Sequence, residues 1–91
     1  MKLQWTEKGL SDLARLYEFL ASIDPQAAAK AVQALTAAVG RLPRHPRLGE
    51  RLEQFERREV RRLVTGRYEI RYEIREATIT VLRLWHSRED R

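Results

Sequence analysis

The sequence contains no cysteine, and its two histidines, His45 and His86, stand far apart in the chain. The first absence excludes a disulfide framework and thiolate metal sites. The wide separation of the two histidines argues against a structural metal. There is also no Gly-rich phosphate loop and no Ser/His/Asp arrangement. These absences predict a protein that needs neither a cofactor nor a metal.

Long apolar runs are missing as well. The first ten residues lack the apolar segment of a signal peptide, and no run approaches the length of a membrane span. Together with the absence of cysteine, this predicts a cytoplasmic protein. The chain has 91 residues and is 43% hydrophobic, which predicts one domain, residues 1–91, with a packed core.

Basic residues are unevenly placed along the chain. The net charge is +5, and residues 1–40 hold four basic and four acidic groups, so all of the excess lies beyond residue 40. Fifteen of the eighteen basic residues are arginine, and no lysine follows Lys30. The planar guanidinium group of arginine suits carboxylates and phosphates at interfaces. A GC-rich genome would explain the arginine bias, but it would not explain the crowding into the second half.

The stretch Gly66–Arg88 contains the central feature of the predicted fold. Over Arg67–Arg75, tyrosine and isoleucine alternate with arginine and glutamate, as in a strand with one buried and one solvated face. After a break at residues 76–77, a second β-rich run covers Thr78–Trp85. So short a connection predicts an antiparallel hairpin. Apolar residues on both faces of the second run predict an interior strand.

The first half of the chain predicts a strand followed by two helices. Residues 2–5 alternate as a brief strand, Thr6 is a good N-cap, and a wide apolar stripe at helical spacing follows it. Asp24-Pro25 begins a second, alanine-rich helix. This helix is expected to extend to about Leu42, because Pro43 cannot continue it.

The remaining segments complete a small sheet. Residues 50–58 predict a short strand or an irregular edge, and residues 59–65 predict the strand before the hairpin. The order β-α-α-β-β-β predicts an α+β fold, in which an N-terminal helical hairpin backs a small, mostly antiparallel sheet. The long helical crossover lets the first strand lie parallel beside the last. That pairing would make Trp5 and Trp85 neighbours in the core.

Four features in this order resemble the RelE/ParE superfamily of bacterial type II toxins, over nearly the whole chain. They are the opening strand with its helical hairpin, HPRLG at residues 45–49, VRRLVTGRYEIRYEI at residues 60–74 and ITVLRLWHSRED at residues 79–90. The resemblance implies a toxin that a co-expressed antitoxin neutralises. It also implies one of two activities: RelE-like members cut mRNA in the ribosomal A site, and ParE-like members poison DNA gyrase.

The ribonuclease branch would need residues that this chain largely lacks. Relatives that end in His-Tyr have an arginine on the central strand where this chain has Glu69, and a tyrosine where it has Ser87. Other relatives use lysines in the middle of the chain, where this sequence has none. His86 remains as the one candidate general base. It would be the catalytic residue if the chain were a ribonuclease.

The ParE branch fits better, because poisoning by binding requires no acid–base groups. We therefore predict a ParE-like toxin that binds DNA gyrase, arrests growth, contributes to plasmid stabilisation and is neutralised by an antitoxin encoded beside it. The first alternative is a ribosome-dependent mRNA endoribonuclease. The second is a basic RNA-binding domain without toxicity, whose binding would be steeply salt-dependent.

Two groups of residues are candidates for binding. The first would contact the target and combines strand arginines with groups at the end of the last strand: Arg61, Arg62, Arg83, His86 and Arg88. The alternative for the strand arginines is an internal carboxylate such as Glu69 or Glu73, and the alternative for His86 is a sheet-edge role.

The second group would bind the antitoxin. It consists of apolar residues that widen the stripe of the first helix beyond what one sheet face needs: Leu16, Phe19 and Ile23. The alternative for these three is a wider internal core. The charged ladder of Arg67–Arg75 is expected to face solvent.

Overall fold

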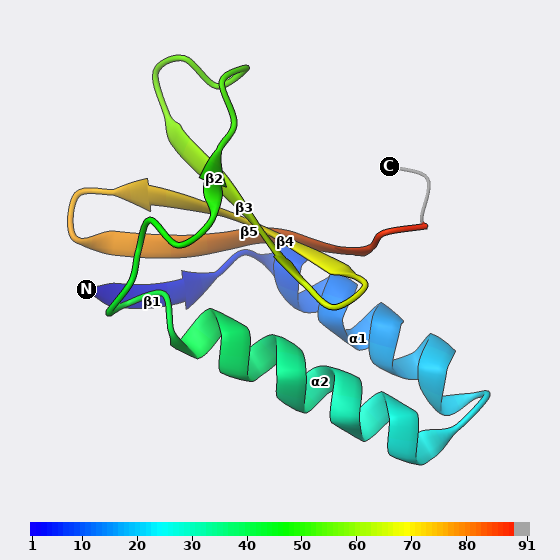
Figure 1. Ribbon diagram of the computed structural model, residues 1–91. Coiled ribbons are helices and arrows are strands. Elements are labelled where there is room, and N and C mark those ends of the chain that lie inside the picture. The colour runs from blue at the N-terminus through cyan, green and yellow to red at the C-terminus, as the bar shows by residue number, and fades with distance from the viewer. Residues whose placement is uncertain (89–91) are drawn as a thin grey trace.

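The alternating segment becomes the middle strand of a five-stranded sheet. The computed structural model describes residues 1–88, and the strand order is β1-β5-β4-β3-β2 (Figure 1). The strands are β1 Lys2–Trp5, β2 Glu50–Arg51, β3 Glu59–Thr65, β4 Tyr68–Arg75 and β5 Thr78–His86. β1 runs parallel to β5, and the other neighbouring pairs are antiparallel. The predicted hairpin, the interior last strand and the parallel first strand are confirmed.

Two antiparallel helices, α1 (Glu7–Ala21) and α2 (Pro25–Gly40), cover one face of the sheet (Figure 1). The Thr6 side chain accepts a hydrogen bond from Gly9 N at 2.9 Å, so the predicted cap of α1 is present. Within residues 1–88, no helix is long and apolar enough to cross a membrane. The predicted α+β fold with a helical hairpin behind the sheet is confirmed.

The second helix ends earlier than predicted. Its last residue is Gly40, whereas the sequence predicted an end near Leu42. The backbone N–H of Leu42 donates to Val39 O at 3.0 Å, three residues back, which tightens the last turn instead of continuing the helix. Leu42 is nonetheless fully buried, because the turn directs it into the core.

The core lies between the helical hairpin and the side of the sheet that faces it. Its buried members come from both layers: Leu16, Leu35, Ala38, Val39, Leu42, Leu63, Ile70, Tyr72, Ile74, Ile79, Val81 and Leu84. Each fully buried leucine or isoleucine contributes roughly 1.5–3 kcal/mol. Because α2 is rich in alanine, its few large side chains carry most of its contact with the sheet.

The opposite face of the sheet is less solvated than predicted. Glu69 is only 3% exposed, and its carboxylate lies 3.3 Å from Arg71 Nη2. Trp85 is opposite Glu69 in register and covers this face. It is not a neighbour of Trp5, because β1 ends before it reaches that part of β5. The prediction of a tryptophan pair is therefore wrong. The ladder faces solvent at Arg67 and Arg75, as predicted, but not at Glu69.

A buried tyrosine holds the loop between α2 and β2. Tyr72 Oη donates to Pro46 O at 2.7 Å and accepts from Gly49 N at 2.9 Å. Arg61 Nη1 donates to Gly49 O at 2.7 Å. A Cβ atom on Gly49 would lie 2.5 Å from Arg62 O and 3.0 Å from the Tyr72 ring. The loop is thus a closely packed structure in which only glycine fits at this position.

Replacing Gly49 with alanine is expected to lower the free energy of unfolding by about 1–3 kcal/mol, because the new methyl group meets backbone rather than a flexible side chain. Gly40→Ala is the control, since no atom lies within 4 Å of the added Cβ. Because Gly40 is the last residue of α2, that control should raise stability by less than the roughly 0.5–1 kcal/mol expected in the middle of a helix. Urea unfolding measures both variants, and equal stabilities would contradict the packing argument.

Candidate functional site

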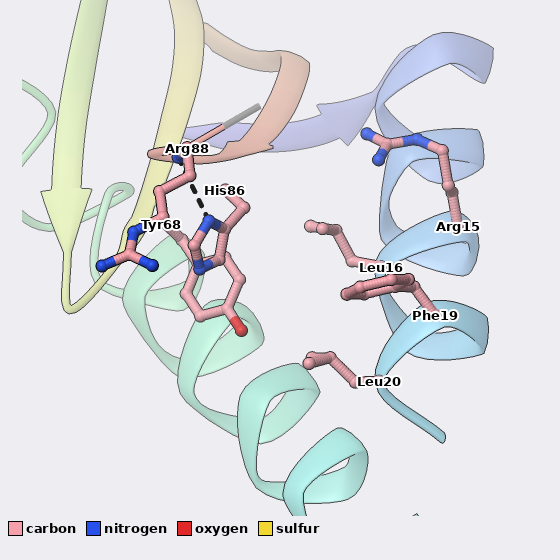
Figure 2. A pocket seen from close by; sticks show the side chains of 7 residues that line it. All are labelled: Arg15, Leu16, Phe19, Leu20, Tyr68, His86 and Arg88. Atoms are coloured by element: carbon pink, nitrogen blue, oxygen red, sulfur yellow. Dashed lines mark hydrogen bonds between the residues drawn. The ribbon is translucent and has the colours of Figure 1, made fainter. Parts of the chain in front are cut away.

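A groove of about 510 Å³ opens between α1 and the end of β5. One wall consists of α1 side chains and the other of an aromatic pair (Figure 2). The lining residues are Arg15, Leu16, Phe19, Leu20, Tyr68, His86 and Arg88. No acidic side chain of residues 1–88 lines it. The groove therefore suits an apolar partner segment, with cationic groups at its rim.

The three predicted antitoxin-binding residues differ in their exposure and in their position relative to the groove. Leu16 is 3% exposed and belongs to the core, as the alternative prediction had it, although its side chain still borders the groove. Phe19 is 63% exposed and projects toward the groove (Figure 2). Ile23 is 72% exposed and lies beyond the end of α1, outside the lining. Phe19 is the member of the three that is both exposed and inside the groove.

His86 forms the opposite wall together with Tyr68. The two residues face each other across β4 and β5, and their rings meet edge to face with centroids 5.3 Å apart. His86 Nδ1 accepts a hydrogen bond from Arg88 N at 3.1 Å. In the neutral imidazole the proton therefore lies on Nε2. The structure brings two predicted target-binding residues, His86 and Arg88, to the same groove as Phe19.

One buried carboxylate sets the position of α1 against the sheet. Asp12 Oδ2 accepts from Leu84 N at 2.9 Å and from Arg83 Nε at 2.7 Å, and Oδ1 accepts from Arg83 Nη2 at 3.2 Å. Asp12 thereby takes the place of a strand beside β5, beyond the end of β1. Sequence reasoning missed this residue. The available signal was its position on the buried stripe of α1, with Gly9 and Leu16 at helical spacing.

The electrostatics of this contact favour the ionised carboxylate. Burial raises the pKa of Asp12, but the hydrogen bonds from Arg83 and from a backbone N–H, with the charge of Arg83, outweigh it. The pKa therefore lies below its ordinary value of 3.8. Burial also raises the pKa of Glu59, but hydrogen bonds from Arg61 and Arg47 lower it by more. The pKa of Glu59 therefore lies below its ordinary value of 4.5.

The predicted target-binding arginines do not form one cluster. Arg61 donates to Glu59 Oε2 at 2.7 Å and lies on the helix-facing side of the sheet. Arg62 lies on the other side and donates to Glu50. Arg83 is bound by the helix carboxylate described above. The alternative of an internal partner therefore describes all three arginines.

Three arginines stand side by side on the open face of the sheet. Arg62 is opposite Arg71, and Arg71 is opposite Arg83. Like charges in register destabilise a sheet unless something offsets them. Here Arg71 Cζ lies 4.7 Å and Arg83 Cζ 5.3 Å from the centroid of the Trp85 ring, and Glu69 lies between Arg62 and Arg71. Sequence reasoning missed this cluster, because strand register assembles it from three separate segments.

The described residues form binding surfaces and hold no metal cluster. Within residues 1–88, no three histidine, aspartate or glutamate side chains come together where they could bind an ion. Four arginines of the sheet bind carboxylates: Arg61, Arg62, Arg71 and Arg83. The chemistry available at the groove is apolar contact, aromatic contact and cationic hydrogen bonding.

Solved structures place this fold among proteins of toxin–antitoxin systems. The chain is similar to one from the chromosomal ParDE TA system of P. aeruginosa, with a TM-score of 0.75 and 25% identity, covering 94% of this chain and 95% of that one. It is also similar to a chain of the toxin–antitoxin complex RelBE2 from Mycobacterium tuberculosis. The TM-score is 0.63 and the identity 25%, and the match covers 93% of this chain and 88% of that one. No curated protein sequence matches significantly. The chain is therefore a toxin of the RelE/ParE superfamily.

Within that superfamily the assignment is narrower. Residues 3–91 match the family described as ParE toxin of type II toxin-antitoxin system, parDE. The chain belongs to this family. The resemblance drawn from the sequence motifs is confirmed, and the last two residues of the ending motif, 89–90, lie outside the described residues.

Replacing Asp12 with asparagine tests the contact between α1 and β5. The variant keeps an acceptor for Leu84 N but removes the charge that faces Arg83. We expect its free energy of unfolding at pH 7 to fall by about 1–3 kcal/mol. Asp24→Asn is the control: asparagine caps a helix as well as aspartate does, so its stability should change by less than about 0.5 kcal/mol.

The stability difference between wild type and Asp12→Asn should depend on pH. Because the folded pKa of Asp12 lies below 3.8, its stabilising effect is complete above that value and is lost as the pH falls through the folded pKa. The difference should therefore stay constant from pH 7 to about pH 5 and shrink in more acidic solution. Urea unfolding at a series of pH values measures it. A difference that persists unchanged in strong acid would contradict the role of the charge.

Proposed function

We propose that this toxin acts by binding and poisoning DNA gyrase, and that a cognate antitoxin neutralises it. The observation that carries the proposal is the match of residues 3–91 to ParE toxins. The solved ParDE relative, which shares 95% of its length with this chain, is consistent with it. A target of this kind places the protein in the cytoplasm. Ribosome-dependent mRNA cleavage remains the second candidate, because the RelBE2 chain has a similar fold.

The central strand supports binding over cleavage. Glu69 stands where the resemblance to ribonuclease relatives puts an arginine. Its carboxylate lies 3.3 Å from Arg71 Nη2 and 3.8 Å from Arg62 Nη1. A buried carboxylate at this place would repel the phosphate that a ribonuclease must bind. Arg62 and Arg71 already bind the Glu69 carboxylate, so they are less available to a phosphate.

The geometry of His86 also supports binding. A general base must offer a lone pair to the proton that it removes. In His86 the lone pair of Nδ1 accepts the hydrogen bond from Arg88 N. His86 and Arg88 then serve as contact groups for the target at the end of β5, where an edge-to-face tyrosine holds the imidazole in position.

The groove beside α1 is the proposed antitoxin site. Phe19 is exposed at its wall, Ile23 continues the apolar surface past the end of α1, and Leu20 and Leu16 line the interior. An antitoxin segment with apolar side chains at helical or strand spacing would bury this surface. Occupation of the groove would also cover His86, so neutralisation and target binding would exclude each other.

The proposal predicts which synthesis stops first when the toxin is induced without its antitoxin. Gyrase poisoning should reduce DNA synthesis within minutes while translation continues. Pulse labelling with a DNA precursor and an amino acid, followed in parallel, measures both rates. Early loss of translation would instead favour the ribonuclease, and His86→Ala should then abolish mRNA cleavage. Continued synthesis of both would contradict both activities.

Phe19→Ala tests the antitoxin site. Because Phe19 is largely exposed, its loss should leave folding intact but weaken antitoxin binding by about 1–4 kcal/mol, roughly tenfold to several hundredfold. Tyr17→Ala is the matched control, an exposed aromatic residue on the same helix that does not line the groove. Titration calorimetry with the antitoxin encoded beside the toxin measures both variants. Equal affinities of the two variants would show that the antitoxin binds elsewhere.

A further inference from the structure

We infer that the loop between α2 and β2 binds the phosphate backbone of duplex DNA. Residues 41–49 contain three arginines and one histidine, and no acidic residue. The cationic residues, Arg41, Arg44 and Arg47, are all exposed, and so is His45. We name residues 41–49 the basic loop. This inference goes beyond the proposed poisoning of gyrase and does not require it.

The basic loop differs from the middle of the sheet in how its charges are compensated. Arg58 forms two hydrogen bonds of 2.9 Å with the Glu73 carboxylate, and the other sheet arginines described above also bind carboxylates. Among residues 1–88, neither Arg41 nor Arg44 forms an ion pair. Arg47 binds Glu59, which Arg61 already contacts. In this range, other exposed arginines without an ion pair each have an acidic residue within two positions in the sequence: Arg51, Arg57, Arg67 and Arg75. Residues 41–49 contain no acidic residue. Positive charge is therefore less compensated at this loop than at those positions, and an external anion would meet it there.

The loop is also prepared for binding by its own hydrogen bonds. Arg44 N and His45 N donate to Arg41 O at 3.2 and 3.0 Å, and Leu48 N donates to His45 O at 3.1 Å. Tyr72, buried in the core, holds its far end through Pro46 and Gly49, as described above. A backbone that is already ordered loses little conformational entropy when its side chains bind a ligand. The cations therefore stand on a rigid support.

The position of the basic loop allows it to act separately from the groove. It lies at the end of α2 near the N-terminus, whereas the groove lies at the other end of the molecule, beside the second half of α1 (Figure 1). The long axis of the molecule is 40 Å. An antitoxin segment in the groove would leave the loop accessible, so the neutralised toxin would retain the DNA contact.

The side chains of the basic loop favour duplex DNA over single-stranded RNA. Proteins that bind single strands stack bases on aromatic side chains, and residues 41–49 contain no phenylalanine, tyrosine or tryptophan. Contacts to a duplex backbone need only cations, and arginine forms paired hydrogen bonds with phosphate oxygens. Duplex DNA also has a dense row of phosphates, about one charge per 1.7 Å of axis. The expected recognition is independent of base sequence.

The test is the salt dependence of binding to a fluorescein-labelled DNA duplex, measured by fluorescence anisotropy with the full chain. The double variant Arg41→Gln/Arg44→Gln should bind more weakly, and its slope of log K against log salt should be smaller by about 2, since each phosphate contact adds about 0.9. Both side chains are exposed, so thermal unfolding should be unchanged. The matched control is Lys8→Gln/Lys30→Gln, which removes the same charge from exposed helix positions.

Three outcomes would overturn the inference. The first is an equal loss of slope in the loop and helix variants, because binding would then reflect net charge alone. The second is tighter binding of a single-stranded or double-stranded RNA of the same length. The third is no binding of the duplex by the wild type even at low salt, which would leave an acidic protein as the partner of the loop. None of these outcomes bears on gyrase, which the labelling experiment tests separately.

Discussion

The arrangement of this toxin depends on one carboxylate at the edge of one strand. β1 ends before β5 does, which leaves backbone groups of β5 without a strand partner. The Asp12 carboxylate accepts a hydrogen bond from Leu84 N, and the Thr6 hydroxyl donates to Leu82 O at 2.8 Å. The beginning of α1 therefore bonds to the edge of β5 where β1 has ended. Because Arg83 binds the same carboxylate, the helix is anchored by charge as well as by hydrogen bonds. The groove exists because α1, and not another strand, continues from this anchor.

Among residues 1–88, some of the arginines form ion pairs within the sheet, and others are exposed without an ion pair. A guanidinium group inside a sheet requires a carboxylate or a ring face, because an uncompensated buried charge is costly. Arg62, Arg71 and Arg83 satisfy this requirement with carboxylates and with the Trp85 ring. Cations outside the sheet have no such constraint. A high arginine content therefore does not by itself identify a nucleic-acid surface, because carboxylates bind several of the arginines.

Much of the fold was predictable because its signals are local. Alternation over eight residues is enough to specify β4, and a threonine before an amphipathic stripe is enough to begin α1. The candidate site was predictable only in part. His86, Arg88 and Phe19 were selected for separate reasons, and the structure places them around one groove. For Leu16 the sequence left a binding role and a core role open, because helical spacing shows an apolar stripe but not which part of the stripe a sheet covers.

The sequence by itself determined the order of elements, the helix caps, the hairpin and the family, since each is encoded in contiguous residues. Only the tertiary structure decided which charges meet. Asp12 and Arg83 are 71 positions apart, and the bulge between Arg71 and Tyr72 shifts the register of β4 and β5. Register and helix docking depend on the packing of the whole core, which no local pattern records. For that reason the ion pairs and the groove became visible only in the folded chain.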